Sequence, residues 1–83
     1  MKKSDFKKKI ESFLIDSGCK RWDVLPKSFI APNGHRFTVD VEGSIFALFH
    51  RESEWGKKDN FFELWNCPEL ETNTLNFINE RLK

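Results

Sequence analysis

The sequence predicts a single two-layer α+β domain, in which an N-terminal and a C-terminal helix flank an antiparallel meander sheet of three to four strands. The chain has 83 residues, 39% hydrophobic and 33% charged, which suits one small core and excludes a second domain or a disordered chain. Apolar residues recur at helical spacing near both ends, and turn signals separate alternating segments in the middle. We therefore expect residues 1–83 to form one domain with the order α-β-β-β-β-α.

The first helix is expected from Ser4 to Ser17. Ser4 is a residue type that caps helices, and the acidic Asp5 suits the positive end of the helix dipole. Apolar side chains then recur on one helix face: Phe6, Ile10, Phe13 and Leu14. Gly18 follows at the point where a helix of this length should end, because glycine readily adopts the left-handed conformation that closes a helix.

Two turn signals divide the middle of the chain into strands. Asn33-Gly34 is typical of a two-residue type I′ hairpin, and Glu42-Gly43 is a weaker turn signal between residues 36–41 and 44–51. With both as turns, one face of the sheet is predicted to be apolar: Ile30, Phe37, Val39, Val41, Phe46 and Leu48. The register is decisive, because a slip of one residue turns every side chain of a strand to the other face.

A fourth strand is expected over residues 60–66, after a hydrophilic loop near residues 52–59. Its alternation places Phe62 and Leu64 on one side and three residues on the other: Phe61, Glu63 and Trp65. Residues 19–27 are left open between strand and loop, because Trp22 and Val24 alternate with charged residues but Pro26 limits pairing.

The last helix is expected to be capped by Thr72 or Asn73 and to place three apolar residues on one face: Leu75, Ile78 and Leu82. The α-β-β-β-α order resembles the double-stranded-RNA-binding fold, in which residues 32–35 would occupy the position of a conserved loop. That fold begins its second helix with a basic cluster, whereas this chain has acidic and apolar residues there: Glu69, Leu70 and Glu71. Membership of that family is therefore not predicted.

Composition also bears on the compartment. The longest apolar run covers residues 45–49, far short of the ~20 residues of a membrane-spanning helix. We expect a cytoplasmic protein with free thiols at Cys19 and Cys67, although an exported chain could join them in one bridge. Residues 1–36 carry a net charge of +5 and residues 37–83 carry −4. Basic and acidic patches could contact different partners or pair with each other, and two solvated faces are the preferred interpretation.

No residue pattern typical of catalysis or metal binding is found. Cys19, His35, His50 and Cys67 would supply a Cys₂His₂ set, and the hairpin register places His35 opposite His50. Structural zinc sites, however, usually take cysteines in close pairs. Cys19 follows a helix C-terminus, where the dipole disfavours a thiolate, and the chain has no glycine-rich phosphate loop. We expect no enzymatic activity, no metal and no cofactor.

The nine Phe and three Trp exceed what the predicted core can hold. Six aromatic residues receive core positions: Phe6, Phe13, Phe37, Phe46, Phe62 and Phe77. Six receive none: Trp22, Phe29, Phe49, Trp55, Phe61 and Trp65. Contiguous exposed aromatic residues mark interaction sites, unless the second helix or the connection after the first helix covers them.

The preferred prediction is a protein-binding module that contacts another protein through the mixed sheet face and the loop with Trp55. Its expected contact residues are Trp55, Arg51, Phe49, Trp65 and Trp22. A symmetric homodimer through the same face is an alternative. The short, motif-free chain, rich in Lys, Asn and Phe, is also typical of a phage or mobile-element accessory protein that modulates a host factor, an association rather than a physical argument.

The alternative function is nucleic-acid binding by two basic segments. One is the cluster on the first helix: Lys7, Lys8 and Lys9, together with Lys2 and Lys3. The other is the loop in which Lys57 and Lys58 follow Trp55, where the indole could stack on a base beside phosphate contacts. The sequence pI of about 7.8 is below the value near ~9 of dedicated nucleic-acid binders, and protein binding is therefore preferred.

Overall fold

The computed structural model describes residues 2–22, 28–53 and 55–82. Within these residues, the helices α1 (Lys3–Asp16) and α2 (Leu70–Leu82) come before and after five strands in the chain. The strands are β1 (Lys20–Arg21), β2 (Ser28–Ile30), β3 (Arg36–Glu42), β4 (Ile45–Arg51) and β5 (Lys58–Leu64). They form one antiparallel meander in the order β1-β2-β3-β4-β5. The predicted fold class is confirmed, with five strands in place of three or four.

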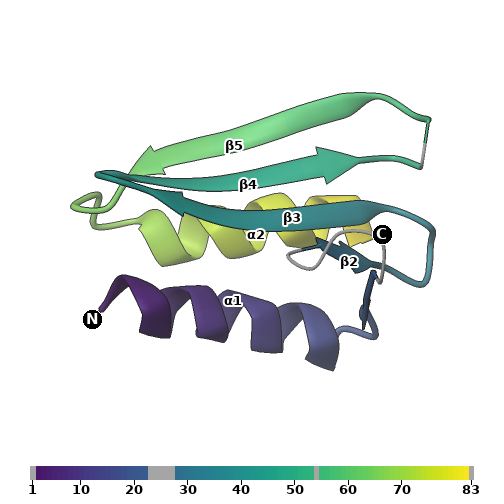
Figure 1. The fold of residues 1–83 in the computed structure, drawn as a ribbon, viewed down its shortest axis with the longest axis horizontal. Coiled ribbons are helices and arrows are strands. Elements are labelled where there is room, and N and C mark those ends of the chain that lie inside the picture. The colour runs from purple at the N-terminus through teal and green to yellow at the C-terminus, as the bar shows by residue number, and fades with distance from the viewer. Residues whose placement is uncertain (1, 23–27, 54, 83) are drawn as a thin grey trace.

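Both helices pack against the same face of the sheet, and the core lies between the two layers (Figure 1). The buried core combines residues of both helices with residues of the strands: Phe6, Ile10, Leu14, Leu70, Ile78, Phe29, Phe37, Val39, Phe46 and Leu48. Lys9 of α1 forms an ion pair with Glu71 of α2 at 2.5 Å, which places the two helices side by side. The predicted apolar face of the first helix is therefore confirmed.

The end of α1 is closed by Gly18, as the sequence predicts. Gly18 has a φ of +96°, the Gly18 amide donates to the carbonyl of Ile15, and the Cys19 amide donates to the carbonyl of Leu14. This pair of bonds is the Schellman arrangement, which requires a left-handed residue after the helix. The start differs slightly, because Lys2 occupies the N-cap position and no side chain caps the helix.

The β2–β3 hairpin has a different turn from the predicted one. The Gly34 amide donates to the carbonyl of Ala31 at 2.9 Å, so Pro32 and Asn33 are the central turn residues, and only Gly34 has positive φ. The predicted type I′ turn would need positive φ at both Asn33 and Gly34, and Asn33 does not have it. Pro32 instead suits the first central position of the observed turn, because its ring fixes φ at about −65°. The result is a three-residue loop, in which the Ala31 amide bonds the carbonyl of His35.

This turn shifts the β2 register by one residue. Phe29 pairs with Phe37 and Ile30 pairs with Arg36, whereas the sequence predicted Ile30 opposite Phe37. Phe29 is therefore fully buried and Ile30 is only partly buried, so the predicted core position of Ile30 is wrong. Lys20 of β1 pairs with Ile30, which answers the open question for residues 20–21. Residues 23–27, which the same question concerned, lie outside the described part of the chain.

The β3–β4 hairpin is shifted by two residues, and its faces are unchanged. Val39 pairs with Leu48 instead of Phe46, because the turn falls on Gly43 and Ser44. Only Gly43 has positive φ, at +57°, which is the requirement of a type II′ turn at its first central residue. Since side chains alternate with a period of two, the predicted apolar set on β3 and β4 is retained.

β5 presents the opposite face from the one predicted. Phe61 pairs with Leu48 and lies against the helix layer, whereas Phe62 is 57% exposed. Trp65, just beyond the strand, packs its ring 5.6 Å from the rings of both Phe6 and Phe46. The predicted core position of Phe62 is therefore wrong, and Phe61 and Trp65 occupy the core side of the sheet.

α2 begins at Leu70, before the two predicted caps. Leu70 is buried in the core, and the side chain of Thr74 donates to its carbonyl at 2.7 Å. Asn73 does not cap the helix, because its amide nitrogen donates to both carboxylate oxygens of Glu63 on β5. This contact ties α2 to the edge strand of the sheet.

The register of β2 predicts a difference between two neighbouring residues. Phe29→Ala should lower the free energy of unfolding by about 3–5 kcal/mol, because it leaves a cavity in the core. Ile30→Ala should cost only about 1 kcal/mol, since that side chain is partly exposed. Urea denaturation of the two variants compares the losses. A larger loss for Ile30→Ala would contradict this register.

Candidate functional site

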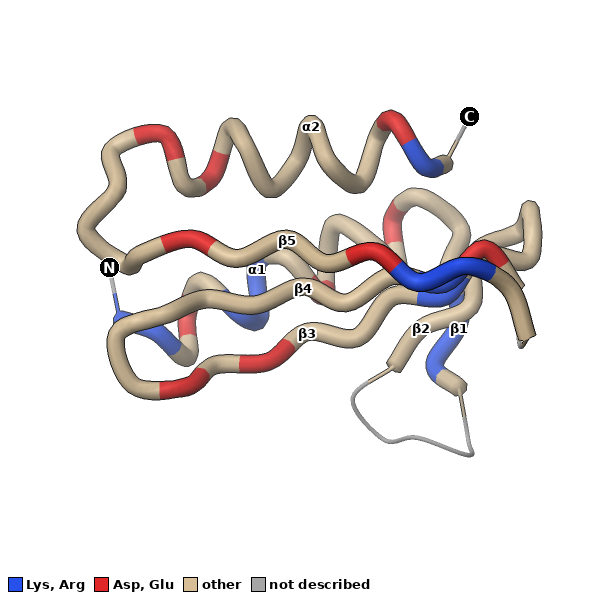
Figure 2. The backbone as a smooth tube through the Cα atoms, turned by 90° about the horizontal axis from the view of Figure 1, so that it is seen from above, with Lys and Arg blue, Asp and Glu red and all other residues tan. Residues whose placement is uncertain are grey.

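The face of the sheet opposite the helices is the candidate site, and we call it the open face. Side chains alternate along a strand, so the neighbours of the buried residues on β3, β4 and β5 point to this side. The open face consists of Arg36, Thr38, Asp40, Glu42, Ile45, Ala47, Phe49, Arg51, Lys58, Asn60, Phe62 and Leu64. Neither of the two described helices packs against it, and Figure 2 shows α2 beyond β5 and α1 behind the strands.

One end of the open face is apolar. Ile45 and Leu64 pair directly across β4 and β5 and are 40% and 53% exposed. Phe62 is 57% exposed, and its ring meets that of Phe49 edge to face at 5.7 Å between centroids. Exposed apolar side chains are common singly, but a contiguous group on neighbouring strands marks an interaction surface.

The other end of the open face is basic. Arg36 pairs with Arg51, and Arg51 pairs with Lys58, so three cations stand in one row across three adjacent strands. Like charges directly opposite each other weaken a sheet. The guanidinium of Arg36 lies 5.0 Å from the centroid of the Trp22 ring and donates to the carbonyl of Gly34. The row therefore favours binding of a negatively charged group.

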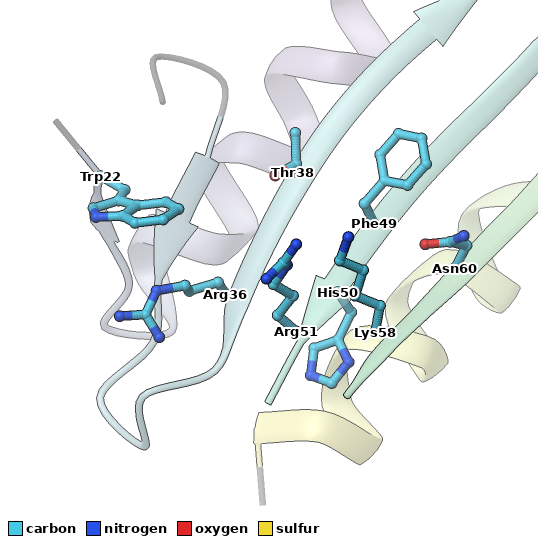
Figure 3. A pocket seen from close by; sticks show the side chains of 8 residues that line it. All are labelled: Trp22, Arg36, Thr38, Phe49, His50, Arg51, Lys58 and Asn60. Carbon is cyan, nitrogen blue, oxygen red and sulfur yellow. The ribbon is translucent and has the colours of Figure 1, made fainter. Parts of the chain in front are cut away.

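A cavity of about 210 Å³ opens at this basic end. Its wall is formed by side chains from β3, β4 and β5 and by the residue after β1: Trp22, Arg36, Thr38, Phe49, His50, Arg51, Lys58 and Asn60. Figure 3 shows Trp22 and Arg36 on one side, Phe49 and Asn60 on the other, and Arg51 and Lys58 between them. The cavity thus combines aromatic walls with positive charge.

The structure brings most of the predicted protein-binding residues together. Trp22, Phe49 and Arg51 line the same cavity. Trp55 is not among the lining residues and is 88% exposed in the connection between β4 and β5. Trp65 does not join them, because its ring packs with aromatic residues on the helix side. The prediction that placed Trp65 on the exposed face is corrected by the register of β5.

The predicted nucleic-acid residues are divided between two layers. Lys58 lines the basic cavity, and Lys57 is exposed beside it. Lys7, Lys8 and Lys9 belong to α1, on the helix layer, and Lys9 is paired with Glu71. The two basic segments therefore do not form one continuous surface.

A chain of hydrogen bonds lies behind the cavity, and the sequence analysis missed most of it. His50 is only 4% exposed; its Nε2 lies 2.8 Å from Nδ1 of His35, and its Nδ1 lies 2.5 Å from the carboxylate of Asp59. Arg81 of α2 donates to the other oxygen of Asp59, and Asn33 donates to the carbonyl of Arg81. This chain of hydrogen bonds joins the β2–β3 turn, β4, β5 and α2.

The two central groups of this network have shifted pKa values. Burial lowers the pKa of His50 more than the hydrogen bond to Asp59 raises it, so His50 is neutral near pH 7. Burial acts to raise the pKa of Asp59, but the hydrogen bonds from Arg81 and His50 together outweigh it and lower that pKa. The sequence signal for the network was the expected proximity of the two histidines. That contact is present although His50 pairs with Phe37 on the strand.

The cysteines lie apart from the histidine pair. Burial raises the pKa of Cys19, and the hydrogen bond to Glu63 raises the pKa of Cys67, so both thiols stay protonated at neutral pH. Both are free cysteines. Among the described residues, no three His, Cys, Asp or Glu side chains gather as metal ligands, and no described helix has the length and apolar character to span a membrane.

The lowered pKa of His50 predicts acid sensitivity. The folded-state pKa is below the ordinary value of 6.5, so the stabilising contribution is complete above pH 6.5 and is lost as pH falls below it. Each unit of lowering corresponds to about 1.4 kcal/mol. Urea unfolding between pH 7.5 and pH 5 should therefore show a decline that is weaker in His50→Gln. Asp59 adds its own loss only below pH 3.8, outside this range. An unchanged decline in His50→Gln would refute the assignment.

Comparisons with known proteins give no relative. No protein-family model matches the chain, and no curated protein or solved structure matches it significantly. The chemistry of the open face and its cavity is therefore the ground on which a function can be proposed.

Proposed function

We propose that the chain is a protein-binding module, rather than an enzyme, and that it docks on a partner through the open face. The observation that carries the proposal is the exposed apolar group of Ile45, Phe62 and Leu64 on the side of the sheet opposite the helices. Burial of such side chains in an interface is worth roughly 25 cal/mol per Å² of apolar surface. The uncovered group thus provides a driving force for association.

The basic end of the same face defines the chemistry of the partner. The row of Arg36, Arg51 and Lys58 lies next to the aromatic side chains of Trp22 and Phe49. Trp and Arg are the residue types most often found at the energetic centres of protein interfaces. A partner that presents an apolar strip with acidic groups beside it would complement both ends of the face.

Trp55 extends this surface along the β4–β5 connection. At 88% exposure, its indole is the most exposed of the large hydrophobic side chains that the structure describes. A large rigid side chain in this position can enter a pocket of a partner at a small entropic cost. We therefore include Trp55 in the contact surface.

Substitution of the open face should reduce partner binding without unfolding the chain. Phe62→Lys places a charge in the apolar group and should lower recovery of bound proteins by about tenfold or more in affinity capture from the source cell. Ile15→Lys is the matched control, because Ile15 is also an exposed apolar residue, at 47%, but belongs to α1. Equal recovery by both variants and the wild type would refute the proposal.

A second candidate function, nucleic-acid binding, is favoured by the row of three cations beside Trp22. A single strand could lay its phosphates along the row and stack a base on an aromatic side chain. The acidic residues elsewhere on the open face, Asp40 and Glu42, oppose an extended contact of this kind. Protein binding is therefore the preferred proposal.

Salt dependence distinguishes the second candidate from the first. If phosphates occupy the row, fluorescence anisotropy with a labelled single-stranded oligonucleotide should show affinity that falls steeply between 50 and 200 mM salt. Lys58→Ala should weaken this binding and lower the salt slope by about 1. Lys8→Ala on α1 serves as the control of equal charge change. Absence of binding at 50 mM salt would exclude nucleic acid as the partner of the open face.

A further inference from the structure

Positive and negative side chains lie at opposite ends of the open face along the strand direction. The cations Arg36, Arg51 and Lys58 occupy one end, and the acidic Asp40 and Glu42 occupy the other end of β3 (Figure 2). The apolar Ile45 and Leu64 lie at the acidic end as well. One copy of the face thus carries the features that a partner for another copy would need.

We propose that the partner of the open face is a second copy of this chain, bound face to face about a two-fold axis. The inference rests on the proposed function, because it names the occupant of the same surface. The axis lies between the two sheets and runs perpendicular to the strands. This orientation reverses the strand direction and brings the basic end of each copy against the acidic, apolar end of the other.

Electrostatics selects this axis from the two that stack one sheet on its own copy with the strands of both copies aligned. A two-fold axis along the strands would place the row of Arg36, Arg51 and Lys58 over the same row of the second copy. Juxtaposed like charges cost several kcal/mol at an interface. The perpendicular axis instead stacks β3 on β3 with Arg36 of each copy over Glu42 of the other, and this happens twice in an isologous dimer.

The strand register fits the same axis. Val39, Leu48 and Phe61 lie side by side at the midpoints of β3, β4 and β5, so one axis crosses all three strands at equivalent positions. Residues equally distant from a midpoint then face each other. Phe49 of one copy lies over Ala47 of the other, and Phe62 lies over Asn60. Bulky side chains thus meet smaller ones, as interdigitating sheet faces about 10 Å apart require.

The cavity at the basic end receives the apolar end of the second copy in this arrangement. Ile45 lies over Arg51 and Leu64 lies over Lys58, in the cavity that Trp22 and Phe49 line from opposite sides. The long aliphatic stems of Arg and Lys can cover apolar side chains while their charged heads stay in water. Each cavity of about 210 Å³ would therefore be filled by side chains of the other copy.

Charge reversal with mixing tests the proposal. Light scattering and sedimentation of the purified chain should show a dimer, and Arg36→Glu or Glu42→Arg alone should raise the dimer Kd by about 100-fold or more. An equimolar mixture of the two variants should recover the dimer, because each then offers the charge that the other needs. Lys8→Glu and Asp16→Arg on α1 make the same changes in net charge on the helix layer and should leave the dimer intact.

Several results would overturn the proposal. A wild-type chain that stays monomeric at millimolar concentration would do so, as would single variants that dimerise as well as the wild type. Arg36 also contacts Trp22 and Gly34, so circular dichroism checks the fold of its variant. If that variant does not fold, Phe62→Lys replaces it, since an intact dimer in Phe62→Lys would equally contradict the arrangement.

Measurements of self-association and of capture of a different protein together distinguish failure of the dimer from failure of the proposed function. A monomeric wild type whose capture of a different protein still depends on Phe62 would refute the second copy as partner and retain the docking face. Loss of both self-association and Phe62-dependent capture would refute the two together. Dimerisation abolished by the charge reversals and restored by mixing would support both.

Discussion

The packing of both helices on one side of the sheet is the interaction on which the other features depend. It buries Phe37, Phe46 and Leu48, and the alternation of side chains along a strand then turns their neighbours outward. The described residues form only two helices, and both pack against the same face of the sheet. The aromatic and aliphatic residues of the open face are the consequence.

The basic row has a local cost for the pairing of β3, β4 and β5. Arg36, Arg51 and Lys58 stand directly opposite one another, an arrangement that weakens strand pairing. Behind the row, the network of His50, Asp59 and Arg81 ties the same strand ends to α2. The hydrogen bonds of His50 are partly buried, which makes them costly to break, whereas the bonds between Arg81 and Asp59 are exposed. The end of the sheet that carries the repulsive charges is thus also tied to α2 by polar contacts.

Much of the fold could be predicted from local signals in the sequence. The helical spacing from Phe6 to Leu14, the helix end at Gly18 and the alternation on β3 and β4 are confirmed, since each depends on residues close together in the chain. The register of β2 could not be predicted from Asn33-Gly34 alone. Pro32 suits the first central position of a turn over residues 31–34, which competes with the predicted turn centred on Asn33 and Gly34. The turn over residues 31–34 forms, and its register buries Phe29 instead of Ile30.

The candidate site was predicted only in part, because the register of β5 could not be read from the sequence. Trp22, Phe49 and Arg51 were expected to contact a partner, and they line one cavity, but Trp65 is on the core side. β5 carries aromatic residues at successive positions, so its alternation does not distinguish the two faces. Pairing with β4 settled the question, because Phe61 is next to Leu48 and Phe62 is next to Ala47. The expected neighbours His35 and His50 do meet, although through side chains rather than as paired strand residues.

The sequence by itself determined the element types, their order, the amphipathic first helix and the excess of aromatic residues over core positions. Those properties follow from composition, spacing and turn chemistry, which act over a few residues. Only the tertiary structure decided which aromatic residues form the core, that three cations stand in one row, and that His50, Asp59 and Arg81 meet. These features depend on strand register and on the docking of α2, which are set by long-range packing rather than by any local pattern.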